Sequence, residues 1–163
     1  MIHSLRLLFL SAIVLLAGAA TAQADTATVH VVRKGCDAVL TMERLRTLPV
    51  HEATITERDG NTATFQGVWL SDALDLGCDS TVHLDKHGTL RAVVKVTAAD
   101  GFTAVVAMAE VADAFSARPV LLAWARNGQP LGERHGPLRL VVPGDIKPGR
   151  NVRQVKRLEV ITP

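Results

Sequence analysis

The segment VHEATITERDGNTATFQGV, residues 50–68, decides the fold class because it has the pattern of a β-hairpin. Apolar and β-branched residues flank a turn-forming Asp-Gly pair that ends at Gly60, and such pairs favour tight connections between antiparallel strands. A second segment with this pattern, LRAVVKVTAADGFTAVVAM, covers residues 90–108 and has its Asp-Gly pair at Gly101. The sequence therefore predicts two hairpins as the framework of the fold.

Shorter segments on either side extend this strand-rich pattern. Apolar runs and alternation predict further strands at residues 28–32, 120–131, 138–142 and 155–161, the second of these strands ending in a turn at 127–130. Helical spacing predicts short helices at residues 41–48, 69–76 and 109–115, and Thr41 is suited to cap the first. The expected fold is a hairpin-dominated α+β domain with short helices.

The N-terminal segment has the features of a secretory signal peptide. Arg6 precedes an apolar run, and an A-x-A motif ends at Ala24. The alternative is a membrane anchor, but the apolar run is shorter than the roughly 20 residues that span a bilayer. We therefore expect residues 1–24 to be removed on export to the periplasm, leaving residues 25–163 as a domain without membrane attachment.

The overall composition excludes some classes of partner. The chain has 163 residues and a formal net charge of +2, and it shows no basic stripe with interleaved aromatic residues, so nucleic-acid binding is not expected. Aromatic residues make up 4% of the chain and tyrosine is absent, which predicts an aliphatic core.

The chain contains two cysteines, Cys36 and Cys78. An oxidising compartment favours a disulfide between them, and a loop of this length predicts a stabilisation of about 4 kcal/mol. The alternatives are two separate buried thiols or a redox-active dithiol, although the two cysteines do not form a C-x-x-C motif.

Five stretches, taken in order, point to a family. They are LRTLP (45–49), FQGVWLSDAL (65–74), DGF (100–102), LLAWARNGQPL (121–131), and RHGPLRLVVPG (134–144) with VRQVKRLEV (152–160). Together they resemble the molybdopterin-binding domain of the sulfite oxidase family of oxidoreductases, in its small, stand-alone, exported form. The resemblance covers about residues 40–161 and implies a strand-rich mixed-sheet fold of the sulfite-oxidase type, with molybdopterin as the expected cofactor.

The resemblance also implies three cofactor-binding residues. The segment that contains His135 and Arg139 is similar to one that lies along the pyranopterin and its phosphate in catalytic members. Arg153 stands where a lysine would be expected, so the positive charge is kept. Arg139 offers a planar fork of donors suited to phosphate. The alternative for Arg139 is an arginine on the solvent face of its strand, paired with a nearby carboxylate.

The chain departs from the family at the metal ligand. Catalytic members bind molybdenum through a cysteine thiolate in the region that corresponds to residues 51–60, which contains no cysteine here. Cys36 and Cys78 lie elsewhere in the chain, so we predict no metal ligand and leave the catalytic residues unknown. Two functions stay open. The first is an oxidoreductase-like protein that holds the cofactor without cysteine or through a redox partner protein. The second is a non-catalytic binding or signalling module whose groove takes a small anion or a partner.

Other polar residues are expected to have no chemical role. Glu52 and Glu57 alternate along a strand edge, and His83 and His87 are predicted to lie in a solvated loop.

Overall fold

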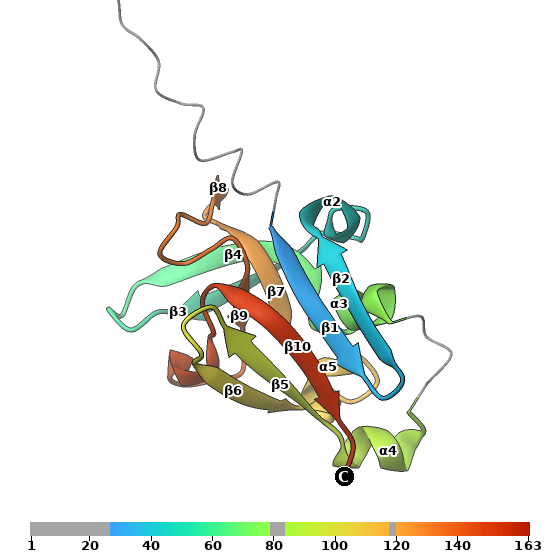
Figure 1. Cartoon of the computed structure of the whole chain (residues 1–163). Helices are drawn as coiled ribbons and strands as arrows, with labels where there is room; N and C mark the ends of the chain where they lie inside the picture. The colour runs from blue at the N-terminus through green and yellow to red at the C-terminus, as the bar shows by residue number, and fades with distance from the viewer. Residues whose placement is uncertain (1–26, 79–83, 118–119) are drawn as a thin grey trace, which may run out of the picture.

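The computed structural model describes residues 27–78, 84–117 and 120–163, which form two β-sheets with short helices at their ends (Figure 1). The first sheet, sheet A, has the strand order β2-β1-β10-β5-β6. Its strands are β1 (Thr28–Arg33), β2 (Cys36–Thr41), β5 (Val93–Ala98), β6 (Thr103–Ala107) and β10 (Val155–Ile161). Because β1 and β10 are parallel and the other neighbours are antiparallel, sheet A is a mixed sheet.

The second sheet, sheet B, is antiparallel and has the order β3-β4-β7-β8, with β9 also paired to β7. Its strands are β3 (His51–Thr56), β4 (Thr62–Trp69), β7 (Leu121–Arg126), β8 (Gln129–Pro130) and β9 (Arg139–Val141). The helices are α2 (Met42–Leu45), α3 (Leu70–Gly77), α4 (Lys86–Arg91), α5 (Met108–Val111) and the 3-10 turn η1 (Pro148–Arg150).

Both predicted hairpins are confirmed, as β3–β4 and β5–β6. Gly60 and Gly101 have φ angles of 84° and 85°, a conformation that glycine adopts without strain. The Thr41 hydroxyl accepts a hydrogen bond from the Arg44 amide at 3.3 Å and caps α2 as expected. The strand-rich α+β class is therefore confirmed.

Two local predictions were wrong. Residues 86–91 form helix α4 rather than a loop, because the Asp85 carboxylate accepts a hydrogen bond from the Gly88 amide at 2.6 Å and caps the helix. His87 is therefore helical, and the second hairpin begins at Val93 instead of residue 90; His83 lies outside the described residues.

The strand predicted at residues 120–131 ends at Arg126. After a tight turn, residues 129–130 pair back onto it as β8. Positive φ angles of 49° at Asn127 and 75° at Gly128 provide the reversal.

The main core lies between the two sheets. Val29, Val96 and Leu158 of sheet A are fully buried there with Leu122 and Leu140 of sheet B. The next residues along β7 and β9 point the other way, into a smaller cluster around Phe65. Since both faces of this part of sheet B are buried, its central strands are a rigid support for the side chains at their ends.

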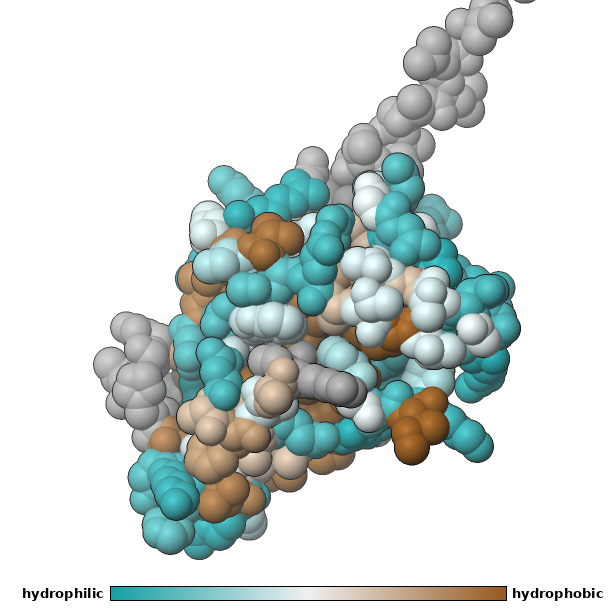
Figure 2. Space-filling model, turned by 180° about the vertical axis from the view of Figure 1, so that it is seen from behind, coloured by the Kyte–Doolittle hydropathy of each residue, from teal (hydrophilic) through white to brown (hydrophobic). Residues whose placement is uncertain are grey.

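The outer surface is mostly polar. Figure 2 shows several separate apolar patches (brown) surrounded by hydrophilic residues (teal) on the face opposite to that of Figure 1. Scattered exposed apolar residues of this kind are normal for a folded domain. Within the described parts of the chain, no helix has the length and apolar character needed to cross a bilayer.

The predicted disulfide is present between Cys36 and Cys78, whose Cα atoms are 5.8 Å apart. It joins the start of β2 to the end of α3 and so fixes this helix against the edge of sheet A.

Gly67 provides a stability test of the β4–β7 contact. A Cβ atom at this position would collide with the Leu122 carbonyl oxygen and lie 2.6 Å from the Ala123 Cα. Both obstacles are backbone, so we expect Gly67→Ala to lower the free energy of unfolding by about 2 kcal/mol in urea titrations. Gly144→Ala is the control, since nothing lies within 4 Å of the corresponding Cβ; equal effects of the two variants would contradict this packing.

Candidate functional site

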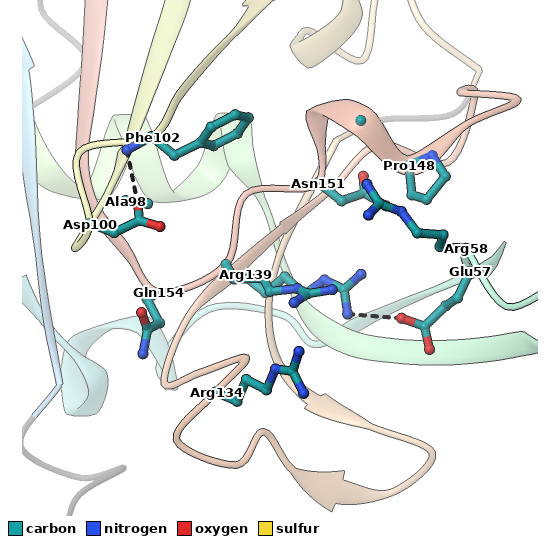
Figure 3. Close-up of a pocket in the computed structure, with 12 residues that line it drawn as sticks. Glu57, Arg58, Ala98, Asp100, Phe102, Arg134, Arg139, Pro148, Asn151 and Gln154 are labelled. Atoms are coloured by element: carbon teal, nitrogen blue, oxygen red, sulfur yellow. Dashed lines mark hydrogen bonds and ion pairs between the residues drawn. The ribbon is translucent and has the colours of Figure 1, made fainter.

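A cavity of about 330 Å³ opens where the end of sheet B meets one end of sheet A (Figure 3). Sheet B contributes Arg139 from β9 and the residues directly after β3, and sheet A contributes the β5–β6 turn and the segment leading into β10. The residues that line the cavity come in three groups: Glu57, Arg58, Arg134 and Arg139; Ala98, Asp100 and Phe102; and Pro148, Gly149, Asn151, Arg153 and Gln154.

Arg139 is the central side chain of this cavity and only 3% exposed. Its guanidinium carbon lies 4.6 Å from the centre of the Phe65 ring, a cation–π contact that supports it from the core. Its Nη1 donates to Glu57 Oε1 at 3.0 Å. The alternative prediction for Arg139 placed it on a solvent-facing side of its strand, paired with a carboxylate. Its solvent exposure is wrong, because Arg139 is buried, and its pairing with a carboxylate is confirmed.

Glu57 was expected to have no chemical role, and the structure corrects this. Its Oε2 accepts a hydrogen bond from Arg126 Nε at 2.8 Å and forms an ion pair with Arg126 Nη2 at 2.6 Å, and its Oε1 accepts a hydrogen bond from Arg139. Burial by itself would raise the pKa of Glu57, but the hydrogen bonds from Arg126 and Arg139 hold it below its usual 4.5. Glu57 is therefore a fixed negative charge in the wall of the cavity.

Two residues that line the cavity each have a buried donor atom with no hydrogen-bond partner within the described structure: Arg139 at Nε and Asn151 at Nδ2. Asn151 is 8% exposed and is held in place because its Oδ1 accepts from the Val142 amide at 2.8 Å. In Figure 3, Asn151 and Arg134 lie on opposite sides of Arg139. A buried donor left unpaired is unfavourable, so this pair points to a ligand that accepts hydrogen bonds.

The charges in the cavity favour an anion. Its lining contains four arginines, at positions 58, 134, 139 and 153, against the two carboxylates of Glu57 and Asp100. Asp100 is engaged by the Phe102 amide, which donates to its Oδ1 at 2.9 Å. Phe102 is 51% exposed and is the one aromatic residue among those that line the cavity.

The three residues named from the sequence lie in one region. Arg139 and Arg153 line the same cavity. His135 is outside the lining, but burial lowers its pKa below 6.5 and the charges of Arg153 and Arg139 lower it further, so it lies within their field. Sequence reasoning missed Glu57, Asn151 and Arg134, which complete the site.

The lowered pKa of His135 predicts a pH-dependent stability. The native state binds fewer protons at this histidine than the unfolded chain does, so stability is lost as the pH falls below about 6.5. We expect wild type to lose more thermal stability than His135→Gln between roughly pH 7.5 and pH 5.5, which spans the range of histidine titration. Parallel melting curves for the two proteins over this range would contradict the placement of His135 among these cations.

The donors in the cavity fit the phosphate of a molybdopterin-type ligand, but the chain does not supply the thiolate of the family. The two cysteines of the sequence are joined in the disulfide, at the β2 edge of sheet A, while the cavity is bordered by the turn between β5 and β6 at the other edge. Within the described ranges, no group of three or more His, Cys, Asp or Glu side chains is arranged to hold a metal ion.

The fold and the cavity define an α+β domain with an arginine-lined pocket. The family model for the oxidoreductase molybdopterin binding domain matches residues 21–163, which is most of the chain, and the chain belongs to this family. No curated protein matches it.

Proposed function

We propose that this protein binds a small phosphate-bearing ligand of the molybdopterin type in the arginine-lined cavity. The observation that carries the proposal is the pair of buried, unpartnered donors, Arg139 Nε and Asn151 Nδ2, in one cavity with four arginines. Membership of the molybdopterin-binding family supports this ligand class. Such a cofactor, when bound, would supply two-electron redox chemistry at its molybdenum.

Each side chain has a role in this proposal. Arg139 and Asn151 donate from fixed, buried positions, and Arg134 and Arg153 add charge-assisted hydrogen bonds to the phosphate oxygens. Phe102 packs against the planar part of the ligand. His135 remains a supporting residue whose proton affinity rises when the anion binds nearby.

The binding that we propose is non-catalytic. Oxygen-transfer chemistry in the family depends on a thiolate ligand, and the disulfide joins both cysteines of this chain. The second candidate is a binding or signalling module in which the same cavity holds an unrelated small anion, and the excess of arginines supports it equally.

We also infer that the protein acts after export to the periplasm. The signal-like segment at residues 1–24 motivates this inference, and the disulfide supports it because such bonds persist in oxidising compartments.

Analysis of the protein purified from its native host tests the proposal. Molybdenum would be measured by elemental mass spectrometry and pterin by fluorescence after oxidation, with the Arg139→Met variant as the control. Bound pterin that is lost in this variant is the expected result. Another small anion bound in the cavity supports the second candidate, and an empty protein that binds no phosphate ester in calorimetry contradicts both.

A further inference from the structure

Glu57 is an unexpected component of a cavity built for anions, because its carboxylate would repel the ligand. We propose that Glu57 is a specificity-determining residue: an internal anion that holds Arg139 before the ligand arrives and competes with the ligand for it. This inference rests on the proposed anion-binding function and goes beyond it, since it names the group that limits which anions bind.

The contacts of Glu57 are divided between two arginines. Its Oε2 accepts a hydrogen bond from Arg126 Nε and forms an ion pair with Arg126 Nη2, and its Oε1 accepts a hydrogen bond from Arg139 Nη1 at 3.0 Å. The Glu57 side chain is 15% exposed, so its charge is poorly screened by solvent. The carboxylate is thus held firmly, and it lines the cavity itself.

The two arginines differ in their relation to the cavity. Arg139 lines the cavity, whereas Arg126 is absent from its lining. Glu57 can therefore keep its hydrogen bond and ion pair with Arg126 while its single contact with Arg139 is exchanged for the ligand. Such an exchange leaves no buried charge unpaired, which is the condition for a low energetic cost.

Competition of this kind selects strong anions. Arg139 Nε is without a partner, but an anion that approaches it also approaches the Glu57 carboxylate. A weakly charged anion gains too little from the cavity to overcome this repulsion, whereas a phosphate dianion engages several arginines at once. A purely structural Glu57, needed only to hold Arg139 in position, would have the opposite effect on binding.

Isothermal titration calorimetry on the full chain with inorganic phosphate and phenyl phosphate, at constant pH and ionic strength, separates these roles. Removing a competing charge without changing side-chain shape, as in Glu57→Gln, is expected to tighten binding about 10-fold. Glu52→Gln is the matched control: Glu52 lies on β3 and accepts a hydrogen bond from Gln66 at 2.7 Å, outside the cavity lining. Unchanged or weaker binding in Glu57→Gln would overturn the proposal.

A second measurement does not depend on the folding of a variant. In the wild type, the pKa of the Glu57 carboxyl is followed by carbon NMR with and without saturating sulfate, which stays a dianion throughout the titration of a carboxyl group. Competition predicts that sulfate raises this pKa, because the carboxylate loses Arg139 and gains a neighbouring anion. An unmoved pKa in a protein that binds sulfate would overturn the inference and leave the proposed function intact.

The remaining outcomes are also distinct. If phosphate and phenyl phosphate bind Glu57→Gln but not the wild type, the internal anion is confirmed as the barrier to binding. If neither protein binds either compound, the proposed function fails together with this inference.

Discussion

Replacement of Arg139 by methionine is expected to weaken the binding of phenyl phosphate about 100-fold, equal to about 2.8 kcal/mol. The substitution removes a buried charge and a donor that has no internal partner, so the ligand loses one or two charge-assisted hydrogen bonds. Glu57 keeps its pair with Arg126, so its carboxylate is not left uncompensated. Calorimetric titration of the two proteins measures the difference.

Arg157→Gln is the control for this loss of charge. Arg157 lies on β10, its side chain is 39% exposed, and it forms a long ion pair of 3.9 Å with Glu159. Its replacement changes the net charge by the same amount, and we expect less than a twofold change in affinity. Similar losses in both variants would mean that binding depends on overall charge and not on the cavity.

The Cys36→Ala/Cys78→Ala double variant is expected to lose about 4 kcal/mol of unfolding free energy. The bond closes a loop with a sequence separation of 42, and in the chain-entropy model a loop of this size restricts the unfolded chain by about that amount. Urea titration of wild type and variant, with the midpoint and slope fitted separately, gives the difference.

A reductant provides the control for the disulfide. It should lower the urea midpoint of the wild type toward that of the double variant and leave the double variant unchanged. A wild-type midpoint that is insensitive to complete reduction would contradict a stabilising role for this bond.

The hairpins could be predicted from sequence because their signals are local. Alternation and an Asp-Gly pair lie within a few residues of each other, and the turns at Gly60 and Gly101 form where those pairs occur. The disulfide followed from the presence of two cysteines in a chain expected to be exported. Arg139 and Arg153 were identified through their place in a family-like segment, and the structure brings them into one cavity.

The rest of the site could not be predicted because its interactions are distant in sequence. Glu57 contacts Arg126 and Arg139 across separations of 69 and 82 residues, and strand alternation alone presents it as a solvent-facing residue. Asn151 follows the short turn η1, and its importance lies in a buried, unpartnered amide that only the packing reveals. Helix α4 was not predicted because the residues on either side of it have strand-like patterns. The hydrogen bond from the Gly88 amide to Asp85, which caps this helix, is visible only in the structure.

The two unpartnered donors offer the most direct test that the cavity binds an anion. Nitrogen–proton correlation spectra report the side-chain signals of Arg139 Nε and Asn151 Nδ2 separately from the rest of the protein. We predict that phenyl phosphate shifts both signals together, with one saturable binding curve. Signals that stay in place while only exposed arginines respond would contradict a binding site in this cavity.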